Sequence, residues 1–96
     1  GGKGVATFLG VLLALSWPVG LLCCGTWLLV AAISRISSLA AMISAGSSTF
    51  WLPTTQDPEL FFLGVILTIF IYIRHWENLQ RIKAGTEPKI GQKKDN

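Results

Sequence analysis

The fold is decided by the uncharged stretch GVATFLGVLLALSWPVGLLCCGTWLLVAAIS at residues 4–34, which is almost entirely apolar. The hydrocarbon core of a membrane, about 30 Å thick, is crossed by about 20 helical residues. The stretch is therefore too long for one ordinary span and short for two. Trp17-Pro18-Val19-Gly20 lies near its middle. Proline and glycine favour a turn there, although a single kinked helix would also fit the pattern.

Two more uncharged stretches follow at residues 36–56 and 60–73. Together they predict an all-α integral membrane protein with about four short transmembrane helices. The expected spans are at about residues 4–16, 19–34, 38–52 and 59–76, within a transmembrane region of residues 1–83. Because each span is short, local thinning of the bilayer or burial in a larger bundle is implied.

The composition agrees with a membrane protein. Of the 96 residues, 51% are hydrophobic and 14% are charged, and the mean hydropathy is +0.55. Soluble domains carry about 25% charged residues, and a chain this short cannot bury so much apolar side chain in a water-soluble core. The composition therefore disfavours a soluble enzyme. A nucleic-acid partner is also not expected, because a nucleic-acid-binding protein would be basic without this apolar load.

The two cysteines, Cys23 and Cys24, are neighbours within an apolar run. Adjacent residues of a helix point about 100° apart, so we expect no disulfide between them and assign them to packing. The sequence has no metal-ligand spacing. We therefore expect neither a metal site nor a cofactor.

The net charge of +3 arises entirely after residue 73. With four spans, Lys3, Arg35 and the basic tail of residues 84–96 lie on one side of the membrane, and Asp57 and Glu59 lie on the other. Positive charge marks the cytoplasmic side, so we expect the tail to be cytoplasmic, and also loosely ordered. Three spans would instead place Lys3 on the side opposite the tail.

Small residues recur at helical spacing in two of the expected spans. They are Ala6, Gly10 and Ala14 in the first, and Ala41 and Ala45 in the third. Small residues four apart let membrane helices approach closely. Both sets are therefore expected at helix contacts.

A glycine-rich segment with one lysine, GGKGVAT, occupies residues 1–7. Glycines let backbone N–H groups converge on an anion, and a helix beginning here adds its positive dipole end. This pattern makes Gly1, Gly2, Lys3, Gly4 and Thr7 candidate phosphate-binding residues. The alternative is a glycine-rich turn with a snorkelling lysine. It is not a Walker A loop, because no serine or threonine follows the lysine.

A polar cluster, RHWENLQR at residues 74–81, ends the last expected span. His75 and Asn78 are three residues apart and share a helical face, which Arg81 extends. Polar side chains at membrane depth are candidates for function. Glu77 and Arg81 have the favourable i,i+4 order of a helix-supporting ion pair.

Ser37 and Ser38 begin the third expected span. Serine is a preferred helix N-cap, which is the simple interpretation. This helix N-terminus nevertheless faces the side where His75 lies, so it could help to bind the same anion.

Two motifs carry a resemblance to a known family. GGKGVATF at residues 1–8 and HWENLQRIKAGTEPKIG at residues 75–91 resemble the second and third signature motifs of the bacterial acyl-phosphate:glycerol-3-phosphate acyltransferases, the PlsY family. The segment between them fits as well, with GTWLL at residues 25–29 and SSL at residues 37–39.

The resemblance implies an integral membrane enzyme with about seven spans, of which this chain is the C-terminal part. Such enzymes of the bacterial inner membrane transfer an acyl group from acyl phosphate to glycerol 3-phosphate and yield lysophosphatidic acid for phospholipid synthesis. The implied partners are glycerol 3-phosphate, acyl phosphate and membrane lipid. A further implied partner is the N-terminal half of the same enzyme, with about three spans and the first motif. We therefore expect this chain to be inactive alone.

By position, the resemblance also implies roles for single residues. Those implied in catalysis are His75 and Asn78, and those implied in substrate binding are Gly1, Gly2, Lys3, Gly4, Thr7, Ser37, Ser38 and Arg81. His75 could accept the alcohol proton or donate a hydrogen bond. The rival hypothesis is a small non-enzymatic membrane subunit or transporter fragment with a polybasic tail.

Overall fold

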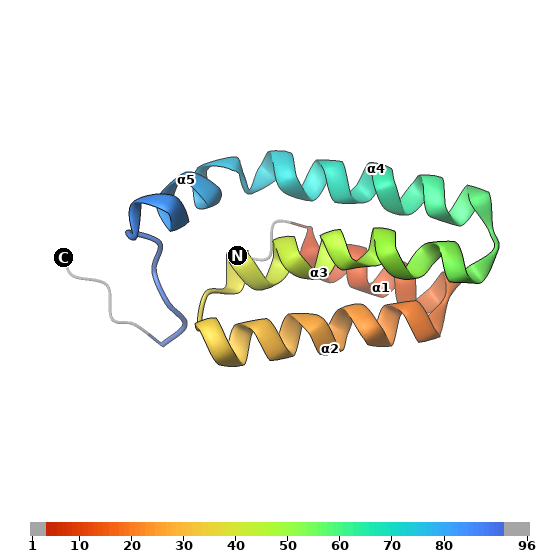
Figure 1. Ribbon diagram of the computed structural model, residues 1–96, viewed down its shortest axis with the longest axis horizontal. Coiled ribbons are helices and arrows are strands. Elements are labelled where there is room, and N and C mark those ends of the chain that lie inside the picture. The colour runs from red at the N-terminus through yellow and green to blue at the C-terminus, as the bar shows by residue number, and fades with distance from the viewer. Residues whose placement is uncertain (1–3, 92–96) are drawn as a thin grey trace.

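The computed structural model describes residues 4–91, and these form helices and connecting turns without a strand. The helices are α1 Val5–Leu15, α2 Trp17–Ser34, α3 Ser37–Trp51, the 3₁₀ helix η1 Leu52–Thr55, α4 Pro58–Arg74 and α5 Trp76–Ala84. Helices α1 to α4 run alternately up and down along one axis, and α5 turns away at one end (Figure 1). Helix α3 packs against both α2 and α4. The all-α prediction is confirmed.

The first uncharged stretch forms two helices, α1 and α2, rather than one kinked helix. The break lies at Ser16, whose N–H bonds to the Leu12 carbonyl and ends α1. The sequence predicted a turn between Trp17 and Gly20, but these residues already belong to the first turn of α2. Proline is tolerated in that turn because its missing N–H has no partner there. Pro18 therefore starts a helix instead of interrupting one.

Helix α1 is much shorter than its antiparallel neighbour α2, with 11 residues against 18. At 1.5 Å per residue, α1 is about 16 Å long, roughly half of a 30 Å hydrocarbon core. The C-terminal part of α2 therefore extends beyond the start of α1 (Figure 1). This difference in length leaves room at one end of the bundle, and the candidate site occupies that room.

The outer surface of the bundle is apolar. Exposed large side chains include Trp17, Leu28, Ile33, Phe50 and Phe62, and Ile33 is 76% exposed. Among the described residues, α2 is long and apolar enough to cross a membrane by itself, and α4 with α5 could form a second crossing bent by 57°. Helices α1 and α3 are shorter than an ordinary span, as their sequences predict.

Polar side chains inside the bundle bond to the backbone of neighbouring helices. The Ser44 hydroxyl donates to the Cys23 carbonyl at 2.7 Å, and the Tyr72 hydroxyl donates to the Met42 carbonyl at 2.8 Å. Thr68 donates to the Ala45 carbonyl of α3 and also, within its own helix, to the Gly64 carbonyl. Interhelical bonds of this kind contribute about 0.6 kcal/mol each in membrane proteins. They join α2 to α3 and α3 to α4, around the core that lies between them.

The two sets of small residues have different outcomes. Ala41 and Ala45 of α3 are buried, as expected for a helix contact. Ala6, Gly10 and Ala14 of α1 are exposed within the described part of the chain, so the contact predicted for them is not made there. The close approach of α1 and α2 occurs at Gly20, which the spacing pattern did not identify.

Gly20 permits a contact that a larger residue would prevent. A Cβ atom at this position would lie 2.6 Å from the Leu13 amide nitrogen, which is backbone and cannot rotate away. We predict that Gly20→Ala lowers the stability of the bundle in detergent by about 1–3 kcal/mol, the usual result of overpacking. Thermal unfolding followed by circular dichroism measures the change.

Gly25→Ala is the matched control, because a Cβ at Gly25 meets no atom within 4 Å. It lies in the same helix and should unfold at the wild-type temperature or slightly above it, since alanine is the better helix former. Equal loss of stability in both variants would contradict the close contact at Gly20.

Candidate active site

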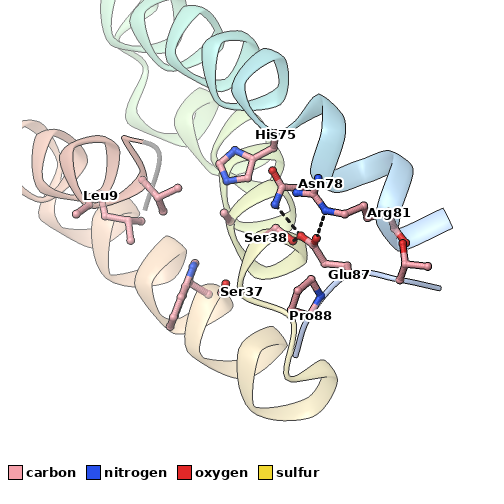
Figure 2. A pocket seen from close by; sticks show the side chains of 13 residues that line it. Leu9, Ser37, Ser38, His75, Asn78, Arg81, Glu87 and Pro88 are labelled. Carbon is pink, nitrogen blue, oxygen red and sulfur yellow. Dashed lines mark hydrogen bonds and ion pairs between the residues drawn. The ribbon is translucent and has the colours of Figure 1, made fainter. Parts of the chain in front are cut away.

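A cavity of about 670 Å³ opens at the end of the bundle where α1 stops short of α2. Its polar wall comes from the start of α3, from α5 and from the segment after α5. Its apolar wall comes from α1, from Trp27 of α2 and from Ala41 of α3. The residues that line it are Val5, Ala6, Leu9, Trp27, Ser37, Ser38, Ala41, His75, Asn78, Arg81, Thr86, Glu87 and Pro88 (Figure 2).

The cavity brings together five of the predicted site residues. Ser37, Ser38, His75, Asn78 and Arg81 all line it, although the serines are far from the others in sequence. Both α1 and α3 begin beside the cavity, so their positive dipole ends point toward it, as the sequence predicted.

His75 forms the break between α4 and α5. Its side chain is almost fully buried, with 2% exposure, and the ring lies against the cavity (Figure 2). Nδ1 lies 2.8 Å from the Ile71 carbonyl oxygen. Because a carbonyl can only accept, Nδ1 carries the proton, and a neutral ring then keeps its lone pair on Nε2. Nε2 is the nitrogen left for a ligand in the cavity.

Glu87 is the centre of the polar wall. Its carboxylate accepts hydrogen bonds from the Ser38 hydroxyl, from Asn78 Nδ2 at 2.7 Å and from Arg81 Nε at 2.7 Å (Figure 2). The Glu87 side chain is only 5% exposed. One carboxylate thus orients three side chains that the sequence proposed as functional.

The bonds to Glu87 change two interpretations made from sequence. Ser38 does not cap α3, because the N-cap residue is Ile36 and α3 has no side-chain cap in the described structure. Arg81 forms its ion pair with Glu87 rather than with Glu77, which is exposed. The side chain of Glu87 reaches Arg81 because the chain reverses after α5 and returns toward α3.

The reversal after α5 contradicts the expectation of a loosely ordered tail for residues 84–91. Gly85 has a left-handed backbone, with φ of 76°, and ends the helix through N–H bonds from Gly85 and Thr86 to the last turn. The chain then passes along the cavity and reaches the turn between α2 and α3. We call residues 85–91 the strap.

The glycine-rich segment is only partly described. Gly1, Gly2 and Lys3 lie outside the described residues. Gly4 has φ of 84° and is the N-cap of α1, directly before Val5 of the cavity wall. Thr7 is exposed on α1 and is not among the residues that line the described cavity.

Glu87 is the residue that the sequence analysis missed as a member of the site. It lies within the quoted motif at residues 75–91, but the sequence analysis gave it no role. An acidic residue within a basic segment, shortly after a glycine that can end a helix, was the available signal. The apolar wall was missed as well, because Leu9 and Trp27 are indistinguishable in sequence from other membrane-facing residues.

The environment of Glu87 favours its ionised form. Partial burial opposes the charge, but hydrogen bonds from Ser38, Arg81 and Asn78 and the positive charge of Arg81 outweigh this cost. The pKa of the Glu87 carboxyl is therefore held below its usual value.

Comparison with known proteins identifies the family. A family model described as glycerol-3-phosphate acyltransferase matches residues 1–85. The chain belongs to the glycerol-3-phosphate acyltransferase family. It is 58% identical over 93 residues to the glycerol-3-phosphate acyltransferase of Ruegeria pomeroyi, covering 97% of this chain and 46% of the relative. It is 57% identical to a relative of the same description from Cereibacter sphaeroides, covering 97% and 44%.

Solved structures show the same fold. The chain is similar to PlsY (YgiH), an integral membrane glycerol 3-phosphate acyltransferase, in its glycerol 3-phosphate form and its lysophosphatidic acid form. The TM-score is 0.88 at 35% identity for both, and the first match covers 95% of this chain and 46% of PlsY. The prediction of an integral membrane helical bundle is thereby confirmed. The chain spans about half the length of the curated relatives it matches.

The depressed pKa of Glu87 predicts how the stability of the site depends on pH. The contribution of the ionised carboxylate is fully present above the ordinary glutamate pKa of about 4.3, and it is lost as the pH falls through the lower folded-state pKa. We expect Glu87→Gln to unfold more easily than wild type at neutral pH, with the difference shrinking below about pH 4. Thermal unfolding in detergent across this range measures it.

Glu77→Gln removes an exposed carboxylate of the neighbouring helix α5 and serves as the control. It should follow the wild-type pH dependence. If Glu87→Gln also follows the wild-type curve at every pH, the carboxylate does not stabilise the site in the way that its bonds indicate.

Proposed function

We propose that this chain supplies the C-terminal part of an acyltransferase that moves an acyl group from acyl phosphate to glycerol 3-phosphate. The product would be lysophosphatidic acid, an intermediate of phospholipid synthesis. One observation carries the proposal. Ser38, His75 and Asn78 meet at one cavity, where α1 and α3 also begin, in a chain that belongs to the glycerol-3-phosphate acyltransferase family.

The polar wall suits a phosphate group. Within the described wall, Arg81 and Glu87 balance each other's charge, so the attraction for an anion comes from elsewhere. Helices α1 and α3 have no side-chain cap in the described structure, which leaves their first N–H groups available to a ligand. Lys3, just before α1, supplies the full positive charge in our proposal.

The apolar wall suits the beginning of an acyl chain. Val5, Leu9, Trp27 and Ala41 contribute to it, and Leu9 lies across the cavity from the polar residues of α5 (Figure 2). An acyl phosphate joins a charged phosphate group to a hydrocarbon chain through one carbonyl group. A cavity with one polar and one apolar side can therefore receive both parts of that substrate.

The chemistry we propose is direct acyl transfer. The first hydroxyl oxygen of glycerol 3-phosphate attacks the carbonyl carbon of the acyl phosphate, the bond from carbonyl carbon to phosphate oxygen breaks, and inorganic phosphate leaves. The hydroxyl proton passes to Nε2 of His75, which keeps a lone pair because Nδ1 donates to Ile71. Phosphate is a good leaving group, so positioning and charge stabilisation are the main requirements.

We further propose that the site and the C-terminus face the cytoplasm of a bacterial inner-membrane protein. Arg35, Arg81 and Lys83 lie at the end of the bundle that holds the cavity, whereas Asp57 and Glu59 lie at the other end. The positive-inside rule assigns the basic end to the cytoplasmic side. Water-soluble glycerol 3-phosphate would then enter from the cytoplasm.

Kinetics of two variants test the assignment of the site. The chain is joined behind the N-terminal part of the Ruegeria pomeroyi relative, and lysophosphatidic acid formed from labelled glycerol 3-phosphate and acyl phosphate is measured in membranes. His75→Ala should lower kcat by about 10²–10⁴-fold, the usual contribution of a general base. Lys3→Ala should mainly raise the KM for glycerol 3-phosphate, by about tenfold or more for a lost charged contact.

Lys83→Ala is the control, because Lys83 is exposed and is not among the residues that line the described cavity. It should keep wild-type kinetics. Normal kcat and KM in both site variants would overturn the assignment of His75 and Lys3 to the active site. A wild-type fusion that consumes no acyl phosphate would favour a non-enzymatic membrane subunit.

Cysteine labelling tests the proposed orientation. Cys23 and Cys24 are first replaced by serine, and single cysteines are then placed at Lys83 or Glu59. A membrane-impermeant maleimide should label Lys83→Cys only from the cytoplasmic side and Glu59→Cys only from the opposite side. Labelling of both from one side would rule out the four-helix crossing pattern.

A further inference from the structure

Arg35 joins the turn between α2 and α3 to the strap by two hydrogen bonds. Its backbone carbonyl accepts from the Ile90 N–H at 2.6 Å, and its guanidinium donates from Nη2 to the Ile90 carbonyl at 2.8 Å. Both bonds use the main chain of Ile90. Arg35 therefore holds the path of the strap rather than any particular side chain of it.

The backbone of Arg35 is unusual. Arg35 ends α2 in the left-handed conformation, with φ of 59°, a region that side chains other than glycine enter at a cost. Glycine would end the helix more easily at this position. The arginine nevertheless adopts this conformation, and its guanidinium bonds to the strap. This indicates that the residue serves to bind Ile90 and not only to end α2.

The strap connects Arg35 to the cavity. Glu87 lies three residues before Ile90 and binds Ser38 of α3 and Asn78 and Arg81 of α5. Thr86 and Pro88 on either side of Glu87 line the cavity. The strap is thus held at three places, by Gly85 at the end of α5, by Glu87 at the polar wall and by Arg35 at the turn before α3.

We propose that Arg35 is a positioning residue of the acyl-transfer site. It is not among the residues that line the described cavity. It acts through Ile90 and the strap, which keep Glu87 in register with Ser38 and Asn78 and so hold these two side chains at fixed positions on the polar wall of the cavity. The role rests on the proposed function, because the ligand whose binding it supports is glycerol 3-phosphate.

Three variants separate this role from helix termination. Arg35→Gly removes the guanidinium but accepts the left-handed backbone, so α2 can still end normally. Arg35→Lys keeps one donor that can reach the Ile90 carbonyl. Ile90→Pro removes the N–H that donates to the Arg35 carbonyl, and so breaks the backbone bond between the two residues while the guanidinium stays in place.

Gln56→Gly is the matched control. Gln56 is the other described non-glycine residue with a left-handed backbone, with φ of 58°, and it lies at the opposite end of the bundle. Its replacement relieves the same kind of strain without touching the strap.

The first readout is independent of activity. Trypsin cleaves after lysine, and the Lys89–Ile90 peptide bond lies within the region that Arg35 holds. In the protein joined to the N-terminal part of the Ruegeria pomeroyi relative, Arg35→Gly and Ile90→Pro should free the strap. Trypsin does not cleave a lysine–proline bond, so Ile90→Pro is left out of this measurement. The cleavage rate is followed by mass spectrometry and compared for Arg35→Gly, Arg35→Lys and Gln56→Gly. We expect a rise of about fivefold in Arg35→Gly, as for one lost hydrogen bond of about 1 kcal/mol, a smaller rise in Arg35→Lys and none in Gln56→Gly.

The second readout is the split between KM and kcat. Arg35→Gly and Ile90→Pro should raise the KM for glycerol 3-phosphate by about fivefold with kcat near wild type, and Arg35→Lys should recover part of the loss. The thermal unfolding temperature of Arg35→Gly should equal that of wild type. A residue that only ends α2 would leave both the cleavage rate and the KM of Arg35→Gly unchanged.

The outcomes distinguish the two proposals. An active wild-type protein whose Arg35→Gly variant keeps the wild-type KM overturns the role of Arg35 and leaves the acyltransferase function intact. The same holds if KM rises equally in Gln56→Gly. A wild-type protein that forms no lysophosphatidic acid overturns the proposed function, and the role of Arg35 with it.

Discussion

The architecture of the site depends on one buried carboxylate. Glu87 accepts hydrogen bonds from Ser38, Asn78 and Arg81, and these donors come from the start of α3 and from α5. A buried charge is costly unless it is paired and fully hydrogen-bonded. Glu87 meets this condition only when the chain has reversed after α5 and α3 begins beside it. The requirement to satisfy this carboxylate therefore couples the position of the strap to the arrangement of the polar wall.

The cavity itself follows from unequal helix lengths. Helix α1 has 11 residues against 18 in α2, so its start at Val5 is recessed from the end of the bundle that α2 reaches. A site recessed in this way can hold a charged group against helix N-termini while an apolar wall lies next to it. The bend of 57° at His75 completes the enclosure, because it turns α5 across the open end.

The sequence predicted much of this arrangement, and the failures have physical causes. The four main helices and the meeting of Ser38 with His75 and Asn78 follow from the lengths of the apolar runs and from the alternating direction of successive helices. The ion-pair partner predicted for Arg81 was wrong. Local i,i+4 spacing favours Glu77, whereas the reversal of the chain at Gly85 brings Glu87 to Arg81. The turn near Pro18 was placed too late, because a proline in the first turn of a helix looks like a helix breaker in sequence.

By itself, the sequence determined that the chain is helical and suited to a membrane, where its charges gather and which motifs it shares with a family. These properties depend on composition and on short-range spacing, which are visible along the chain. Only the tertiary structure decided that residues 85–91 form an ordered strap, that Glu87 organises the polar wall and that Arg35 holds Ile90. These features depend on the contacts of Glu87 with Ser38 and of Arg35 with Ile90, which join segments far apart in sequence through single residues, and no periodic pattern records such contacts.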